Sequence, residues 1–238
     1  MRQSGGMWFE LDGTNILHDP GPGCLVRCKQ YRLSPRRLDA IILSHRHIDH
    51  SNDVNIITEA MTGGGFEPKG LLIAPKQCLD EDPVVLKYVR EFVEIIQSHE
   101  GVSLNINDVK VSFPLRLHHT VETYGTILEF QNRKVGYIPD TEYFEELSRP
   151  YRNVDTLILN VVRITRNPRI SHLNIDDVMR IVSEARPKRA VLTHFGMQVL
   201  KASPEYQAKR ITENTGIDTI AASDGMKLPL DSKGSLFI

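Results

Sequence analysis

The chain has 238 residues, of which 40% are hydrophobic and 25% are charged, and these are ordinary globular proportions. Its 29 Lys and Arg residues against 30 Asp and Glu residues give a net charge of −1, which excludes a generally basic nucleic-acid-binding protein and an acidic disordered tail. The longest apolar runs, such as residues 40–43, fall far short of the ~20 residues of a transmembrane helix. No secretory signal is visible, and the 3 cysteines are an odd number. We therefore expect a cytoplasmic protein with reduced thiols and no membrane partner.

Positive charge is concentrated in residues 27–37, which contain five basic side chains and no acidic one: Arg27, Lys29, Arg32, Arg36 and Arg37. A segment of this kind could contact a phosphate backbone. A solvated loop with a short helix is the more frequent origin of such a run, and we favour it here.

In the first half of the chain, short alternating segments and turn residues predict strands, beginning with a hairpin about Asp12-Gly13-Thr14. A run of apolar residues before Ser44 predicts a short buried strand. The predicted strands cover residues 7–11, 15–18, 38–44 and 70–74, and the predicted helices cover residues 53–61 and 83–97. The second helix is predicted from the spacing of its apolar residues and from Pro83 at its start.

The second half continues with strands and then alternates strands with helices. Asn174 followed by Asp177 resembles a capping box at the start of one helix. The predicted strands cover residues 109–113, 115–118, 125–130, 134–138, 156–161, 190–193 and 219–221, and the predicted helices cover residues 174–184 and 204–213. No internal repeat and no Pro/Gly/Ser-rich linker divides the chain. We expect a single domain over residues 1–238, with two packed sheets and helices outside.

A dense histidine motif follows the predicted strand that ends at Ser44: His45-Arg46-His47-Ile48-Asp49-His50. Side chains alternate along extended backbone, so His45 and His47 point to the same side. A turn then brings Asp49 and His50 to the same space. Imidazole and carboxylate groups suit zinc, manganese or iron. Four such ligands exceed what one tetrahedral ion takes from so short a segment, so the motif predicts two metal ions about 3.5–4 Å apart.

Three further residues follow apolar strands and are candidates for the remaining ligands: His119, Asp140 and His194. Any one of them alone would more often be a capping or surface residue. Together with the first motif, they are predicted to complete the metal site.

These residues occur in an order that resembles the metallo-β-lactamase superfamily. The matching positions are Asp19 after an early strand, the His45–His50 motif, His119, Asp140 within Pro-Asp-Thr and His194 within Leu-Thr-His-Phe-Gly. The resemblance implies an α/β fold, the four-layer αβ/βα sandwich, with the metals at one edge. By analogy, the first metal would be bound by His45, His47 and His119, the second by Asp49, His50 and His194, and Asp140 would bridge the two.

Two assignments stay open within this resemblance. His118 and His119 are adjacent, and we prefer His119 as the ligand because its spacing to Gly125 is that of the RNase Z-like branch. Asp19 corresponds to an acid that supports the metal-binding loop through hydrogen bonds. An ordinary turn residue before Pro20 is an equally good interpretation of Asp19.

The segment from Arg163 to Asp177 resembles the phosphodiesterase-like branch, which includes RNase Z and cyclic-phosphate phosphodiesterases. There, a histidine before a helix cap approaches the metals, which implies that His172 is a general acid. The alternative is a solvent-exposed His172 with no role. Arg163, Arg166 and Arg169 could bind phosphate through charge-assisted hydrogen bonds or could belong to a solvated loop.

The sequence thus predicts a metal-dependent hydrolase whose dinuclear site activates a bridging water and cleaves a phosphodiester. Zinc is the first expectation, with manganese or iron as alternatives. Asp49 would help to orient the water, and His172 would protonate the leaving oxygen. The expected substrate is a small-molecule or nucleotide-like phosphodiester. RNA is not favoured as a substrate, because the sequence shows no extended arm for binding tRNA. The oligomeric state stays open.

Other functions compete for the same motif. A thioester or lactone hydrolase would use the same metal ligands without His172. A flavodiiron oxidoreductase normally has an acid where this chain has His47, and the additional flavin domain is missing, so redox chemistry is disfavoured. A metal-stabilised binding protein without turnover would bind metal and hydrolyse none of these esters.

Overall fold

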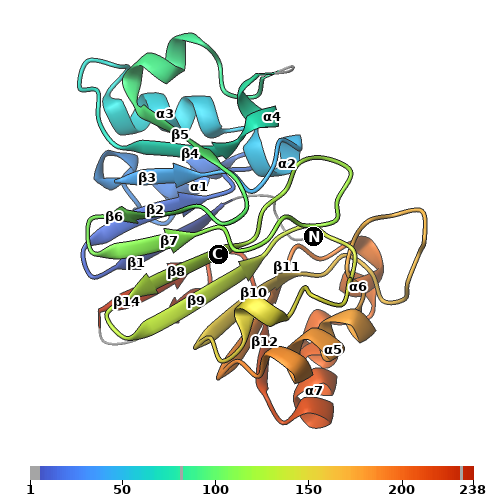
Figure 1. The fold of residues 1–238 in the computed structure, drawn as a ribbon. Coiled ribbons are helices and arrows are strands. Elements are labelled where there is room, and N and C mark those ends of the chain that lie inside the picture. Colours follow the sequence, from blue (N-terminus) through green and yellow to red (C-terminus); the bar gives the residue numbers. More distant parts are fainter. Residues whose placement is uncertain (1–5, 81–82, 231–232) are drawn as a thin grey trace. The chain divides into compact units, whose positions relative to one another are not determined.

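The structure is a computed structural model that describes residues 6–80, 83–230 and 233–238. These residues form two compact units, coloured along the chain in Figure 1. The first unit comprises the described residues up to 99, residues 105–109 and the described residues after 223. The second unit comprises residues 100–104 and 110–223. Within the described ranges, no helix is both long enough and apolar enough to cross a membrane.

The first unit is built on a seven-stranded mixed sheet. Its strand order is β13 (Lys227–Pro229), β14 (Gly234–Phe237), β1 (Met7–Leu11), β2 (Thr14–His18), β3 (Ala40–Ile42), β4 (Leu71–Pro75) and β5 (Glu94–Ser98). Strands β2 to β5 are parallel, whereas β1 is antiparallel to both β2 and β14. The predicted hairpin between β1 and β2 is confirmed, because Asp12 and Gly13 both have the positive φ that a tight Asp-Gly turn requires.

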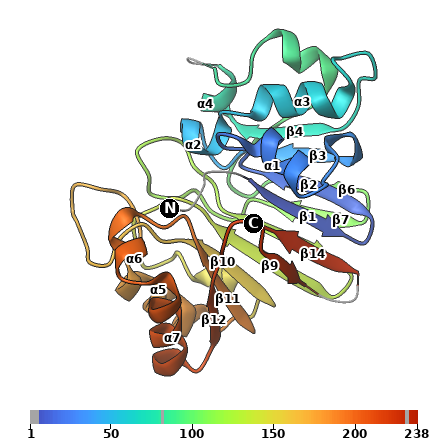
Figure 2. The same ribbon diagram turned by 180° about the vertical axis from the view of Figure 1, so that it is seen from behind.

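Helices cover one face of this sheet, as Figure 2 shows from behind. They are α1 (Cys24–Gln30) and α3 (Val54–Thr62), with the shorter α2 (Ile48–Ser51), α4 (Lys76–Leu79), η1 (Pro35–Arg37) and η2 (Tyr88–Phe92). Cys24, Ile57 and Met61 of the helices pack in one cluster with Ile41 and Leu72 of the strands. Helix α3 ends at Gly63, whose φ of 64° allows the left-handed termination.

The second unit contains most of another seven-stranded mixed sheet. Its order is β12 (Asp218–Ala221), β11 (Arg189–Thr193), β10 (Thr156–Asn160), β9 (Arg133–Ile138), β8 (Thr126–Phe130), β7 (Val109–Ser112) and β6 (Ser103–Ile106). Strands β9 to β12 are parallel, and β7, β8 and β9 pair antiparallel. Parallel strands place their carboxyl ends at the same edge, which is where Asp140 and His194 emerge.

Helices α5 (Ile175–Ala185) and α7 (Pro204–Thr215) cover this sheet, and α6 (Met197–Lys201) and η3 (Arg149–Tyr151) lie in its connections. The predicted capping box of α5 is confirmed: the Asn174 side chain accepts hydrogen bonds from the backbone N–H groups of Asp176 and Asp177, while Asp177 accepts from the Asn174 N–H. Val178, Ile181 and Val182 of α5 pack against apolar residues of β10 and β11. The α/β class predicted from the sequence is confirmed.

Two predicted elements are wrong. Residues 83–97 do not form one helix, because the run ends in η2 and then enters β5, whose Ile95 and Ile96 pair with β4. β-Branched residues favour that parallel pairing. Residues 115–118 form no strand. Pro114 lacks a backbone N–H, and the loop that follows is closed by a single bridge between Arg116 and Tyr124.

Candidate metal centre

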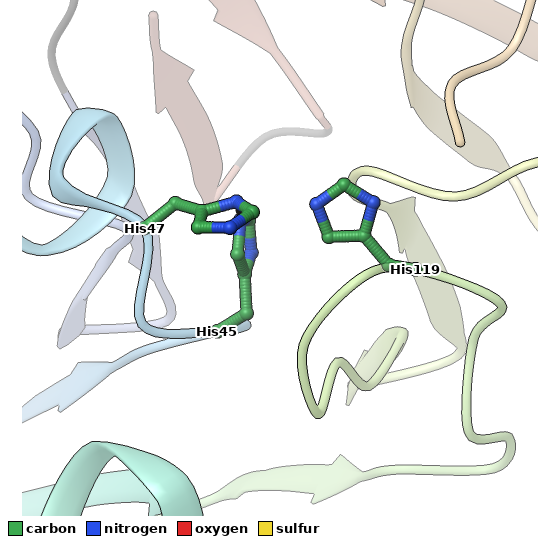
Figure 3. A group of neighbouring side chains, drawn as sticks. All are labelled: His45, His47 and His119. Atoms are coloured by element: carbon green, nitrogen blue, oxygen red, sulfur yellow. Dashed lines mark hydrogen bonds between the residues drawn. The ribbon is translucent and has the colours of Figure 1, made fainter. Parts of the chain in front are cut away.

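The histidine motif lies in the first unit, where strand β3 gives way to helix α2. His47 has extended backbone and precedes the first turn of α2, which carries Asp49 and His50. The Nε2 atom of His45 lies 3.1 Å from Nδ1 of His47, and Figure 3 shows these two rings together. The rings of His45 and His50 are 4.2 Å apart between centroids, and Nε2 of His50 lies 3.8 Å from Oδ2 of Asp49. We call His45, His47, Asp49 and His50 the first half-site.

Asp19 holds the first half-site in place. Its buried carboxylate accepts hydrogen bonds from the backbone N–H of Ser44 at 2.6 Å, from the Ser44 hydroxyl at 2.6 Å and from Nδ1 of His50 at 3.0 Å. Although burial alone would raise it, His18 and His50 hold the pKa of Asp19 well below its usual value. The geometry therefore favours the supporting role of Asp19 over that of an ordinary turn residue.

This network fixes the tautomers of two candidate ligand histidines. Nδ1 of His50 must donate, because an ionised carboxylate only accepts. The Ser44 hydroxyl donates to Asp19, so it accepts at 2.9 Å from Nδ1 of His45. In both rings Nε2 then presents its lone pair, which is the form that a metal ligand needs.

The second unit brings together the other candidates. His119 lies on the loop before β8, Asp140 follows β9, and His172 precedes α5. One ligand atom from each of these three residues lies within 4.8 Å of the others. His194, which follows β11, has Nδ1 3.8 Å from Oδ1 of Asp140. We call His119, Asp140, His172 and His194 the second half-site.

Supporting contacts also orient the second half-site. Nδ1 of His119 donates to the backbone carbonyl of Ser171 at 3.0 Å, which presents Nε2 of His119 as a lone pair. The Asn160 amide donates to Oδ1 of the buried Asp140 at 2.9 Å. His194 has a left-handed backbone with φ of 57°, a conformation that costs a residue other than glycine stability and is concentrated at functional sites.

The geometry distinguishes the two adjacent histidines and favours His119 as the candidate ligand. His119 points to Asp140 and His172, whereas the exposed ring of His118 stacks on Phe144 with 3.9 Å between centroids. His172 is half-buried, its ring centroid is 5.2 Å from that of His119, and its Nδ1 is 3.6 Å from Oδ1 of Asp140. Among the described residues, this buried Nδ1 has no hydrogen-bond partner.

The donor set of each half-site fits a divalent metal ion. Both consist of imidazole nitrogens and carboxylate oxygens, and the buried Nδ1 of His172 lacks a hydrogen-bond partner among the described residues, which a ligand would supply. A pocket of about 480 Å³ opens beside the first half-site and is lined by Arg46, His47, Ile48, Asp49, Pro83 and Val84. It offers room for a small ligand next to two of the candidate ligands.

The supporting residues Ser44, Asn160 and Ser171 were not identified from the sequence. The one available signal is position: Ser44 lies just after β3 and directly before the candidate ligand His45, and Asn160 ends β10, which pairs with the strand that leads to Asp140. The basic residues 27–37 lie in α1, in η1 and in the loop between them. Arg36 forms an ion pair with Glu67, and Arg37 forms one with Glu10. This agrees with the solvated interpretation of that segment.

Comparisons with known proteins agree with this geometry. The family described as "Beta-lactamase superfamily domain" matches residues 14–195. The uncharacterized protein MJ1374 of Methanocaldococcus jannaschii is 30% identical over 96% of this chain and 88% of its own. A ribonuclease Z of Sulfolobus acidocaldarius is 22% identical over 88% of each chain.

Solved structures show the same fold. The metallo-β-lactamase fold protein YhfI of Bacillus subtilis superposes with a TM-score of 0.81 at 22% identity, over 93% of this chain and 90% of its own. A diphosphatase of the PhnP family superposes with a TM-score of 0.71 at 22% identity, over 92% of this chain and 81% of its own. The predicted sandwich class and the resemblance to the RNase Z-like branch are thereby confirmed. The chain belongs to the beta-lactamase superfamily and is a metal-dependent hydrolase of the metallo-β-lactamase fold.

Proposed function

We propose that the two half-sites together bind two divalent metal ions. The first would be held by His45, His47 and His119, the side chains drawn in Figure 3. The second would be held by Asp49, His50 and His194, with Asp140 shared between them. Family membership and the fixed Nε2 lone pairs of His45, His50 and His119 support this proposal. Zinc suits these ligands, and manganese and iron are alternatives. Because the ligands come from both units, we propose that residues 1–238 act as one domain.

We further propose that the reaction is hydrolysis of a phosphodiester, in a small-molecule or nucleotide-like substrate. The observation that carries this proposal is His172, whose buried Nδ1 has no hydrogen-bond partner among the described residues and lies next to two candidate ligands. A ribonuclease and a diphosphatase among the similar proteins agree with chemistry at phosphorus. A cytoplasmic location is supported by Cys24, Cys28 and Cys78, which are buried thiols outside any disulfide.

In this proposal each residue has a definite task. Metal ions at such a site lower the pKa of water and neutralise charge on phosphoryl oxygens. Asp49, whose side chain is 46% exposed, orients the attacking water. His172 donates a proton to the departing alkoxide. Arg163 begins the loop that leads to His172, and its buried Nε has no hydrogen-bond partner among the described residues, so we propose that its guanidinium donates to a phosphate oxygen.

The test compares two leaving groups in a His172→Ala variant. A general acid contributes about 10²- to 10⁴-fold to the rate, so kcat for a dinucleotide, which releases an alkoxide, should fall by that factor. The loss should shrink for bis-p-nitrophenyl phosphate, because p-nitrophenolate leaves without a proton. Metal content by elemental analysis should stay unchanged, and a His99→Ala variant controls for removal of an exposed histidine.

Three results would overturn parts of this proposal. Equal losses for both leaving groups would exclude the acid role and leave positioning of the substrate. Loss of metal from His172→Ala would make His172 a ligand. If the wild-type protein cleaves a thioester or a lactone and no phosphodiester, the thioester or lactone hydrolase predicted as the alternative is correct.

A further inference from the structure

A pair of stacked rings lies beside the second half-site and takes no part in the proposed chemistry. His118 directly precedes the candidate ligand His119, and Phe144 follows Asp140 by four residues. The rings of His118 and Phe144 are nearly parallel, with 19° between their planes and 3.9 Å between their centroids. Phe144 covers one face of the imidazole, yet His118 is exposed, so the remaining surface of its ring faces solvent.

Hydrogen bonds connect the two backbone segments that carry these rings. The N–H of His118 donates to the hydroxyl of Thr141 at 3.1 Å, and the N–H of Glu142 donates to the carbonyl of His118 at 2.9 Å. Thr141 is buried and adjoins Asp140. The segments that carry the ligands His119 and Asp140 are therefore tied together at the point where the ring pair is presented.

Packing of the described residues explains the position of Phe144 but not that of the exposed ring of His118. Phe144 packs at the edge of the apolar cluster of the second unit, which accounts for its own position. His118 adds an exposed aromatic face above it, next to a ligand. Proteins that bind single nucleotides or single strands use such faces, because every base has a π-face that can stack.

We propose that His118 and Phe144 form a stacking platform for a nucleobase of the substrate. This inference rests on the proposed function and makes its substrate class narrower: a phosphodiester with a nucleoside on one side of the scissile bond. Base-to-ring stacking is worth about 1–3 kcal/mol by alanine substitution, which corresponds to about 5- to 150-fold in binding.

The test uses two substrates that share a leaving group, thymidine 5′-(p-nitrophenyl phosphate) and methyl p-nitrophenyl phosphate. The measured quantity is the ratio of their kcat/KM values. His118→Ala should lower this preference for the nucleoside ester by about 5- to 150-fold, mainly through KM. His118→Phe should keep the preference, because it retains a ring, and Phe144→Leu should lower it by removing the support. Tyr206→Ala, which removes an exposed ring from α7, is the matched control and should leave the ratio unchanged.

An equal loss for both esters in His118→Ala would overturn the platform and assign His118 to positioning of His119. Unchanged kcat/KM values for both esters would overturn it as well. If the wild-type protein hydrolyses neither ester, the proposed function fails, and the platform is then tested by calorimetric binding of thymidine 5′-phosphate. Equal affinities of the wild type and His118→Ala in that experiment would overturn the platform on its own.

Discussion

Gly125 should be one of the least replaceable residues near the candidate ligands. It ends the loop that carries His119, and its N–H donates to the carbonyl of Leu115 at 3.3 Å. A Cβ at this position would overlap the hydroxyl of the fully buried Tyr151. Overpacking of this kind costs about 1–3 kcal/mol. We therefore expect Gly125→Ala to lower the free energy of unfolding by that amount and Tm by about 2–4 °C per kcal/mol.

The structure also predicts how to rescue this variant. With the Tyr151 hydroxyl removed, the nearest atom to the new Cβ is the ring Cζ at 3.1 Å, which a small shift accommodates. The hydroxyl itself donates only a long bond of 3.5 Å to the carbonyl of Tyr137, so Tyr151→Phe alone should cost at most about 1 kcal/mol. The loss in the free energy of unfolding of the double variant should therefore be smaller than the sum of the losses in the two single variants.

Urea unfolding of the four proteins in a double-mutant cycle measures this coupling. Elemental analysis provides a second readout, because a displaced loop should also weaken metal retention through His119. Strictly additive costs would refute the reasoning, since they would show that the Tyr151 hydroxyl is not what excludes a side chain at position 125.

Three other predictions concern metal and charge. Protein purified without chelator should contain about two metal ions per chain, and His47→Ala should lose metal by elemental analysis; full retention of both would contradict the ligand assignment. Removal of metal with EDTA should lower the thermal midpoint, because an ion that binds only the folded state stabilises it, and an unchanged midpoint after confirmed removal would contradict this. Asp155 is partly buried, which raises its pKa, but Lys188, the Lys134 N–H and Arg133 lower it further. With its folded pKa lowered, Asp155 stabilises the protein above its unfolded pKa of ~3.9 and loses this contribution as the pH falls through the folded pKa. Asp155→Asn should thus cost roughly 1 kcal/mol at pH 7 and almost nothing in strong acid, as urea unfolding at both pH values would show.

Short sequence motifs predicted the fold correctly where interactions between neighbouring residues determine the structure. The Asp12-Gly13 turn and the capping box of Asn174 are each formed by neighbouring residues, so the sequence carries the whole explanation. Residues 83–97 show the limit of this approach. Their apolar spacing fits a helix, but β5 forms because Ile95 and Ile96 find partners on β4, and that pairing depends on residues more than twenty positions away.

The candidate ligands could be predicted for a similar reason. His45 follows β3, and Asp140 and His194 follow the parallel strands β9 and β11, whose carboxyl ends lie at the same edge of their sheet, whereas His119 lies on a loop. Among the groups that orient them, the family resemblance indicated Asp19, but Ser44 and Asn160 could not be predicted. Asp19 contacts Ser44 across 25 positions, and Asn160 contacts Asp140 across 20, and nothing in either local sequence announces the pairing.

The pairing of strand β14 with strand β1 has a consequence for synthesis on the ribosome. Trp8 of β1 is in register with Phe237, so the first sheet joins residues that are more than 200 positions apart in the sequence. Until residues 234–237 emerge, β1 presents an unpaired edge in the nascent protein, whereas residues 110–223 of the second unit are all made earlier. A chain that stalls or is truncated before residue 234 would therefore expose an edge prone to aggregation.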